Sequence, residues 1–277
     1  MGTSTRAADR TAGLLTPWSI RTYTARVPAS GPYRELVFLE FALAAVTFVG
    51  LRFVTAPYGR YRRGGWGPTV PARVGWLIME SPAPLLFALV YAAGTHSPRL
   101  TPVVLLVMWQ SHYLYRAFAY PFLMRHGARI PVSVMLLAIA FNVLNAWLNA
   151  RWVGEFGDYP ARWLTDPRFL VGLALFGGGL ALNVDADRTL RRLRAPGETG
   201  YRLPKGGPYR WVSCPNYLGE IVEWFGWALA TWSLPGLAFA VYTAANLAPR
   251  AVDHHAWYRR HFPDYPPQRR ALVPFLL

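Results

Sequence analysis

Long apolar runs separated by short basic loops constrain this chain more than any other feature of its sequence. The first run covers residues 36–54, is long enough to cross a bilayer, and is followed by a loop that carries Arg60, Arg62 and Arg63. Hydrophobic residues make up 53% of the 277 residues and charged residues only 16%, which is too apolar for one ordinary soluble core. We therefore predict an all-α polytopic membrane protein, a single domain over residues 1–277 with about seven transmembrane helices.

The other spans follow from the same reasoning. They are expected over residues 74–93, 100–122, 133–152 and 169–190, from just after Pro215 to the break at 233–235, and from there to about Leu247. Residues 1–35 are expected to be an N-terminal extension without a signal peptide, so that the first span directs insertion. Because the arginine-rich loops fall on alternate sides, the positive-inside rule predicts an outside N-terminus and a cytoplasmic C-terminus.

Charge and cysteine content exclude several classes of function. The net charge of +15 comes from arginines in short clusters between apolar runs, which indicates cytoplasmic loops rather than a nucleic-acid surface. The single cysteine, Cys214, rules out an intrachain disulfide and is interpreted as a small residue in a packed loop. The histidines form no ligand motif, so we expect no metal, and neither a P-loop nor a G-x-G-x-x-G fingerprint occurs.

Polar side chains recur at helical spacing in the run after Pro215. Asn216, Glu220 and Glu223 are spaced i, i+4 and i+7, so they share one face of a helix that is otherwise rich in tryptophan and leucine. An acidic side chain is costly in a bilayer, so such groups usually face a polar cavity or a partner. We therefore predict a binding site on this face.

Two earlier spans carry candidate catalytic groups. Glu80 lies inside apolar sequence just before Pro82 and Pro84, a pair that breaks a helix and invites water or ligand, although Glu80 could instead pair with an arginine. The next span has a phenol, a guanidinium and a second phenol on one side, which fits either a site or an interfacial aromatic belt. These residues are Tyr113, Arg116 and Tyr120.

Two later spans have polar or small faces. The amides Asn142, Asn145 and Asn149 share one face of the fourth span, and this favours hydrogen bonding between helices over ligand contact. The fifth span holds the small-residue stretch 172–179, suited to close helix approach, and then Asn183 and Asp187 at i, i+4. Arginines at 188, 191, 192 and 194 follow. This combination suits a sugar and phosphates, although the arginines could serve topology alone.

The C-terminal third, above all residues 203–277, carries the most specific pattern in the chain. PGETGYRLPKGGPYRWVSCPNYLGEIVEWFGWALATWSLP, followed by PRAVDHHAWYRRHFPDYPPQRRALVPF, resembles the steroid 5-alpha-reductase family almost continuously. The likeness extends weakly through PARVGWLIMESP and HYLYRAFAYPFLMR, so it covers roughly residues 73–277. The richness in arginine and alanine indicates a bacterial member, and hence a multi-pass protein of the inner membrane.

The resemblance implies a seven-helix bundle that opens to the cytoplasm, with NADPH between its later helices and loops and a steroid among its earlier ones. It implies that Glu80 and Tyr113 are the catalytic pair. The cofactor-binding residues that it implies are Arg125, Asn183, Asp187, Arg194, Tyr201, Arg202, Asn216, Glu220, Arg250, His254 and Tyr258. Where the family's steroid enzymes often have Gln before the catalytic glutamate, this chain has Met79, which leaves the preferred substrate open.

The reaction expected from the resemblance is NADPH-dependent reduction of the 4,5 double bond of 3-oxo-4-ene steroids, by hydride transfer to C5, to 5-alpha-dihydrosteroids. Addition of hydride pushes negative charge onto the ketone oxygen, to which Glu80 and Tyr113 would both donate hydrogen bonds. The expected partners are this steroid or a related lipid enone, together with membrane lipids. We expect neither nucleic acid nor an obligate protein partner.

Other hypotheses stay open at this stage. One is a membrane methyltransferase of the isoprenylcysteine type, which the arginines between 188 and 202 disfavour because S-adenosylmethionine carries no phosphate. Another is a reductase of a non-steroid enone or enoyl lipid. A non-catalytic lipid-binding or scaffold protein would leave Glu80 and the Asn216 face without a purpose in the bilayer.

Overall fold

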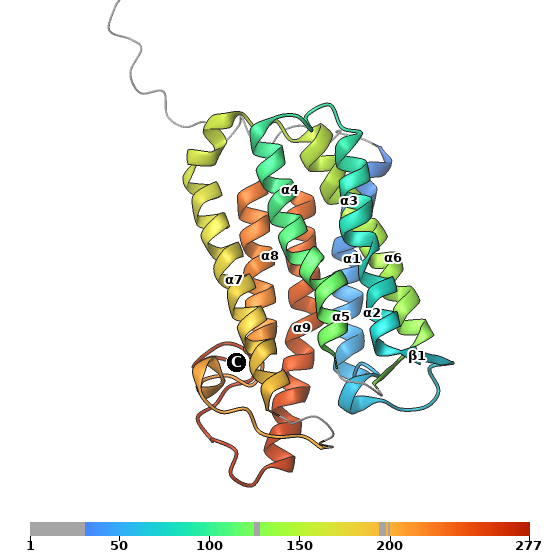
Figure 1. Ribbon diagram of the computed structural model, residues 1–277, viewed down its shortest axis with the longest axis vertical. Coiled ribbons are helices and arrows are strands. Elements are labelled where there is room, and N and C mark those ends of the chain that lie inside the picture. Colours follow the sequence, from blue (N-terminus) through green and yellow to red (C-terminus); the bar gives the residue numbers. More distant parts are fainter. Residues whose placement is uncertain (1–30, 125–127, 194–197, 199) are drawn as a thin grey trace, which may run out of the picture.

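The computed structural model describes residues 31–124, 128–193, 198 and 200–277, and within these the chain forms an elongated bundle of helices. The helices are α1 (Pro32–Phe53), α2 (Ala72–Glu80), α3 (Pro82–Ala92), α4 (Leu100–Tyr113), α5 (Tyr120–Leu123), α6 (Val132–Arg151), α7 (Pro167–Arg192), α8 (Pro215–Thr231) and α9 (Leu234–His261). Most run along the long axis of the molecule (Figure 1). The predicted helical class is confirmed.

A short antiparallel sheet closes one end of the bundle. Strand β1 (Thr69–Pro71) pairs with β2 (Arg129–Pro131), with Val70 opposite Ile130. The sheet joins the loop before α2 to the loop before α6, so two basic loops that are far apart in sequence meet at the same end (Figure 1). Most of the predicted N-terminal extension lies outside the described residues.

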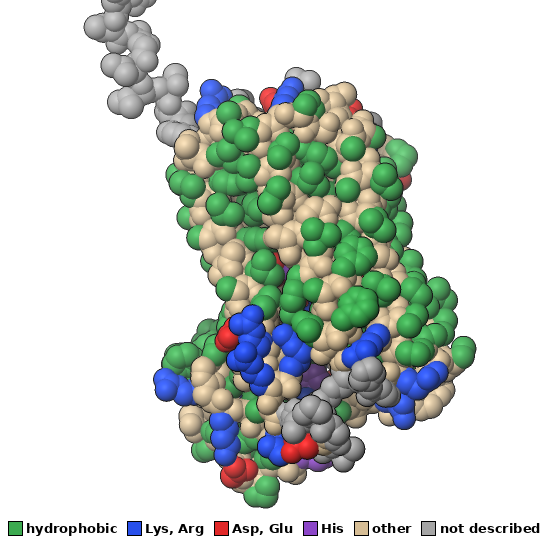
Figure 2. Space-filling model, in the orientation of Figure 1, with side chains coloured by type: hydrophobic (Ala, Val, Ile, Leu, Met, Phe, Trp, Pro, Cys, Tyr) green, Lys and Arg blue, Asp and Glu red, His purple; other side chains and the backbone are tan. Residues whose placement is uncertain are grey.

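Four helical stretches in the described part of the chain are long and apolar enough to cross a membrane. They are Pro32–Phe53, Ala72–Ala92, Val132–Phe156 and Pro167–Arg192. The other predicted spans are also helical but do not meet the criteria of length and apolar composition together, so the count of about seven stays a prediction. Figure 2 shows apolar side chains over most of the visible face and arginine or lysine side chains gathered toward one end.

The helix boundaries correct one expectation. The pair Pro82 and Pro84 was expected to break the helix of the second span. The break is small, because only Ser81 separates the end of α2 from the start of α3 and its backbone angles are helical. A proline at the first positions of a helix breaks no hydrogen bond, because a backbone N–H at these positions has no acceptor within the helix. The last predicted apolar segment, to about Leu247, lies within α9, which continues through Pro249 to His261.

The third span contains an irregularity that its sequence did not predict. Helix α4 ends at Tyr113, and residues Leu114–Ala119 form a π-helical segment before α5. Wider π turns are rare and concentrate at functional sites, because they turn side chains away from the ordinary helical direction. The spacing of Tyr113, Arg116 and Tyr120 is therefore not that of one regular helix face.

Helices α7 and α8 approach each other through two reciprocal pairs of glycines. A Cβ atom at Gly179 would lie 2.5 Å from the carbonyl oxygen of Gly219, and one at Gly219 would lie 2.7 Å from that of Gly179. Gly172 and Gly226 form the second pair, each 2.7 Å from the other's carbonyl oxygen by the same measure. The prediction that stretch 172–179 allows close helix approach is confirmed.

Amides and tryptophans join α6 to the centre of the bundle. Asn149 donates to the side-chain oxygen of Asn145 over 2.8 Å and accepts from the indole of Trp227 on α8 over 2.8 Å. Trp109 stacks on Phe87 with ring centroids 4.5 Å apart. The predicted role of these amides in joining helices is confirmed for Asn149, which bonds to α8, and for Asn142, which bonds to the Met79 carbonyl on α2, whereas the hydrogen bond between Asn145 and Asn149 lies within α6.

The glycine contact yields a test of the fold. We expect Gly179→Ala to destabilise the protein by about 1–3 kcal/mol, because the new methyl group must displace backbone of α8. The neighbouring Gly178 has open space where its Cβ would lie, so Gly178→Ala is the matched control and should be neutral or stabilising. Thermal unfolding of both variants in detergent measures the difference. Equal melting temperatures for the two variants would contradict the packing.

Candidate functional site

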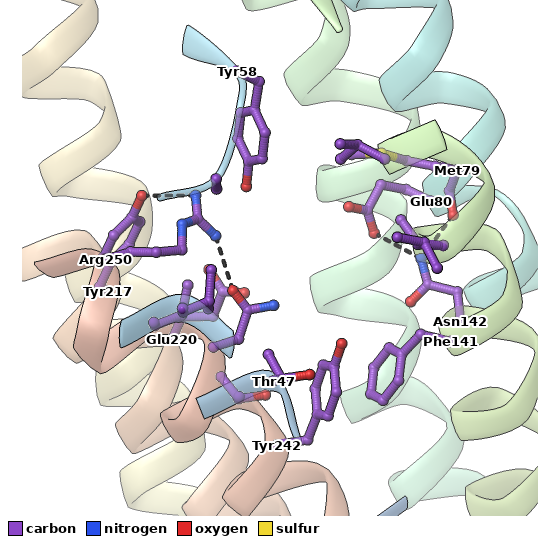
Figure 3. A pocket seen from close by; sticks show the side chains of 18 of the residues that line it. Thr47, Tyr58, Met79, Glu80, Phe141, Asn142, Tyr217, Glu220, Tyr242 and Arg250 are labelled. Carbon is purple, nitrogen blue, oxygen red and sulfur yellow. Dashed lines mark hydrogen bonds between the residues drawn. The ribbon is translucent and has the colours of Figure 1, made fainter. Parts of the chain in front are cut away.

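A cavity of about 500 Å³ opens between α1, α2, α4, α6, α8 and α9. This volume lies within the range of small-molecule sites. Four of the residues predicted to form the site line it: Glu80, Tyr113, Glu220 and Arg250. Figure 3 shows Glu80 and Asn142 on one side of the cavity and Arg250 with Tyr217 on the other. The cavity therefore brings together residues from the first helix of the bundle to the last.

Glu80 stands at the junction of α2 and α3 and is held by α6. The amide nitrogen of Asn142 donates to the Met79 carbonyl over 2.7 Å and lies 3.4 Å from a carboxylate oxygen of Glu80. Asn142 thus differs from the other two amides of its helix, because it holds a cavity residue. The neighbouring Met79 also lines the cavity.

Tyr113 reaches the same cavity from the end of α4. Its side chain is almost fully buried, and its ring packs against Trp109 and Trp224 with centroids 4.9 and 5.6 Å away. These contacts fix the ring in one orientation. Because Tyr113 and Arg116 both line the cavity, the interpretation of this stretch as an interfacial aromatic belt is not supported.

Arg116 organises a buried polar network between α7 and α8. Its guanidinium lies 3.5 Å from Asp187 and 3.9 Å from Glu220. Asn216 donates to Asp187 over 3.0 Å, and Asn183 donates to the backbone carbonyl of Asn216 over 3.0 Å and to Glu220 over 3.4 Å. Four predicted cofactor-binding residues therefore meet around one arginine from the π-helical segment.

A second polar group surrounds Arg250 on α9. Arg250 donates to Tyr217 over 2.9 Å and to Asn246 over 3.1 Å, and its guanidinium packs over Tyr58. The Tyr217 hydroxyl lies 3.1 Å from Nε2 of His254. The other ring nitrogen of His254, Nδ1, is buried and has no hydrogen-bond partner among the described residues.

Arg60, from the first basic loop, joins three aromatic rings of the C-terminal part. The guanidinium lies 4.9 Å from the ring centroid of Tyr201, 4.5 Å from that of Trp257 and 4.8 Å from that of Tyr258. Its Nη2 also donates to the Tyr258 hydroxyl over 3.3 Å, whereas Nη1 is buried without a hydrogen-bond partner among the described residues. The predicted residues Tyr201 and Tyr258 thus contact this arginine and do not line the cavity.

The remaining predicted residues lie apart from the cavity. Arg202 is exposed and forms an ion pair with Glu198. Arg125 and Arg194 lie outside the described residues. Cys214 is a buried loop residue as predicted, and burial raises the pKa of its thiol to about 12. Burial likewise raises the pKa of Tyr61, which stacks on His254, to about 12, so both groups stay protonated at neutral pH.

His112, a buried ion-pair partner, was not among the predicted site residues. Nδ1 of His112 lies 2.9 Å from Oε1 of Glu223, and the Glu223 side chain is fully buried. Glu223 was recognised on its helix face, but the helical spacing around His112 contains no signal for the pairing. Among the residues that the structure describes, no three His, Cys, Asp or Glu side chains gather as metal ligands would.

Comparison with known proteins gives one consistent family. Residues 128–277 match the family model described as 3-oxo-5-alpha-steroid 4-dehydrogenase. The chain is 44% identical over 247 residues to 3-oxo-5-alpha-steroid 4-dehydrogenase 1 of Bos taurus, covering 87% of this chain and 96% of that protein. It is 41% identical over 244 residues to the Homo sapiens protein of the same name, covering 87% and 94%. A steroid 5-alpha-reductase of Arabidopsis thaliana is 38% identical over 257 residues, covering 87% and 98%.

Proposed function

The chain belongs to the steroid 5-alpha-reductase family, and from this premise we propose that it reduces the 4,5 double bond of 3-oxo-4-ene steroids to 5-alpha-dihydrosteroids with NADPH. The observation that carries the proposal is the cavity in which Glu80 and Tyr113, from different helices, lie together. Two hydrogen-bond donors in one largely apolar cavity suit a ketone that gains negative charge during the reaction.

Glu80 and Tyr113 are proposed to stabilise the ketone oxygen. A phenol has a reference pKa of about 10 and is a neutral donor at physiological pH. A carboxyl group in apolar surroundings can stay protonated and donate in the same way. Asn142 holds Glu80 in place, and the rings of Trp109 and Trp224 hold Tyr113, so both donors are fixed before the charge develops.

The polar groups around the cavity fit a dinucleotide. Arg250 and Arg116 are cations that can bind phosphate or orient a carboxamide, and Asp187 and Glu220 can accept hydrogen bonds from hydroxyl or amide groups. His254 Nδ1 is buried without a partner among the described residues, and a ligand could supply one. When bound, NADPH would supply the hydride; the residues named here would hold it and exclude water.

A reductase of a non-steroid enone or enoyl lipid remains the alternative. Met79 favours this alternative, because its side chain lies in the cavity wall beside Glu80, at a position where the family's steroid enzymes often have Gln. Incubation of membranes with NADPH and a panel of 4-ene-3-one steroids, with products identified by mass spectrometry, separates the two. The methyltransferase hypothesis loses its support, since the matched family is a steroid dehydrogenase family.

The proposed orientation has the N-terminus outside the inner membrane of a bacterium and the C-terminus in the cytoplasm. Contacts of Arg60 with Tyr201 and Trp257 support it, since they bring the loop after α1, the loop after α7 and the C-terminal part of α9 to one end. At the other end, Arg99 pairs with Asp158 over 2.8 Å. Basic loops thus gather on one side, as the positive-inside rule requires for the cytoplasmic face.

The catalytic pair can be tested by conservative substitution. We expect Glu80→Gln and Tyr113→Phe each to lower turnover by at least about tenfold to a hundredfold, because each removes a donor at the ketone oxygen. The dissociation constant for NADPH should stay unchanged, as measured by fluorescence titration. Glu155→Gln, near the opposite end of the bundle, is the control and should retain full turnover. Full activity in both test variants would refute the assignment.

Cofactor preference gives a second test. We expect kcat/KM to be at least about tenfold higher with NADPH than with NADH, because arginines such as Arg250 offer partners for the added 2′-phosphate. Arg250→Met should lower the ratio of kcat/KM with NADPH to kcat/KM with NADH. Arg99→Met, at the other end of the molecule, should leave this ratio unchanged. Equal kcat/KM for the two cofactors in the unmodified protein would count against the proposal.

Orientation can be tested by cysteine labelling in intact cells after Cys214→Ser. A membrane-impermeant maleimide should react with a cysteine placed at Asp158, because the proposed orientation exposes this loop to the periplasm. The same reagent should leave a cysteine at Gln268 unlabelled until the cells are opened. Labelling of position 268 from outside would show that the proposed orientation is wrong.

A further inference from the structure

We propose that His112, held by Glu223, is the group that delivers the proton needed to complete the reduction. This inference rests on the proposed function, which leaves one step without a residue. Hydride brings two electrons and one hydrogen to the β carbon of the enone, and the resulting enolate must then take up a proton at its α carbon. Glu80 and Tyr113 are already assigned to the ketone oxygen, so a separate donor is required.

The position of His112 suits this step. Its side chain lines the same cavity as Tyr113, and the two rings pack edge to face with centroids 4.8 Å apart. The ring also packs against Trp224 at 4.7 Å, which restricts its rotation. Since Nδ1 is engaged by Glu223, Nε2 is the ring nitrogen left for the cavity.

The pairing with Glu223 prepares the imidazole to carry a proton. Glu223 is fully buried, and its second oxygen, Oε2, has no hydrogen-bond partner among the described residues, so His112 is its counterion. A buried carboxylate that has a single partner depends strongly on the positive charge of that partner. The pair therefore favours the imidazolium, with one proton on Nδ1 toward Glu223 and one on Nε2.

The surrounding charges act in both directions on His112. Glu220 from α8 and Arg116 from its own span carry opposite charges and line the same cavity, while Glu80 from α2, a protonated donor in the proposed reaction, adds no charge. Arg116 is itself partly neutralised by Asp187 and Glu220. Tyr113, the other titratable neighbour, is neutral as a donor. Glu223, the acid in direct contact with the imidazole, is therefore the group on which the charge of His112 depends most.

The proposed step is balanced in atoms and charge. The Nε2–H bond of His112 breaks and a C–H bond forms at the α carbon, while the enolate oxygen returns to a carbonyl. His112 becomes a neutral imidazole and regains its proton from water before the next turnover. General acid catalysis of this kind contributes typically about 10²- to 10⁴-fold to a rate.

His112→Asn separates this role from a structural one. The amide nitrogen of asparagine takes the place of Nδ1 and keeps the hydrogen bond to Glu223, but nothing replaces Nε2. We expect turnover of the folded variant to fall by at least about 10²-fold, with an unchanged dissociation constant for NADPH, even though loss of the counterion of Glu223 lowers the melting temperature. Added imidazole should restore part of the turnover, which it would not do if the side chain only joined two helices.

Glu223→Gln provides the second variant. It keeps an acceptor for His112 but removes the negative charge, so the imidazole should give up its second proton at lower pH. Turnover should therefore decline at less alkaline pH than in the unmodified protein, while the low-pH end of the profile changes little. The pH profile of Glu223→Gln therefore tests whether His112 donates the proton even if His112→Asn does not fold.

Three results would overturn the proposal. One is near-normal turnover with His112→Asn, and another is a pH profile of Glu223→Gln that matches the unmodified protein. The third is an unmodified protein that binds NADPH but reduces no enone, and this result would overturn the proposed function as well. Turnover by the unmodified protein together with either of the first two results removes only the role of His112.

Discussion

The direct contact of backbone with backbone between α7 and α8 is the constraint on which the rest of the molecule depends. Gly219 lies so close to α7 that a Cβ atom there would be 2.6 Å from the backbone nitrogen of Asn183. Asn183 and Asp187 on one helix, and Asn216 and Glu220 on the other, extend from this contact on successive turns. A shift of one helix along the other would separate all four, so the glycines set the register of the polar network.

The interior of the bundle balances its charges in pairs and networks. Arg116 lies between two acids, and His112 faces Glu223, so these buried ions have partners within hydrogen-bond or ion-pair distance. Glu40 on α1 is the contrast, since its fully buried carboxyl group has no partner among the described residues. An uncharged carboxyl is far cheaper to bury than a charged one, so Glu40 fits the apolar core as a neutral acid.

The periodicity of the sequence predicted those features that a single helix determines by itself. The helices themselves, the shared face of Asn216 and Glu220, and the small-residue stretch of α7 all follow from spacing and residue size. The π-helical segment after Tyr113 was not predicted, and spacing along one span does not reveal the acids on two other helices that Arg116 contacts from this segment. Arg60 was expected only to fix topology, since the aromatic rings that it contacts lie far along the chain.

The contact between Arg60 and Tyr258 also sets an order of events during biosynthesis. The two residues are 198 positions apart, and a ribosome that adds roughly 5–20 residues per second needs about 10–40 s to cover that distance. Until then Arg60 lacks the rings of Trp257 and Tyr258, although the span before it is already complete. The final structure of the basic end therefore forms only after the last helix has left the ribosome, and a chain interrupted before α9 ends would lack it.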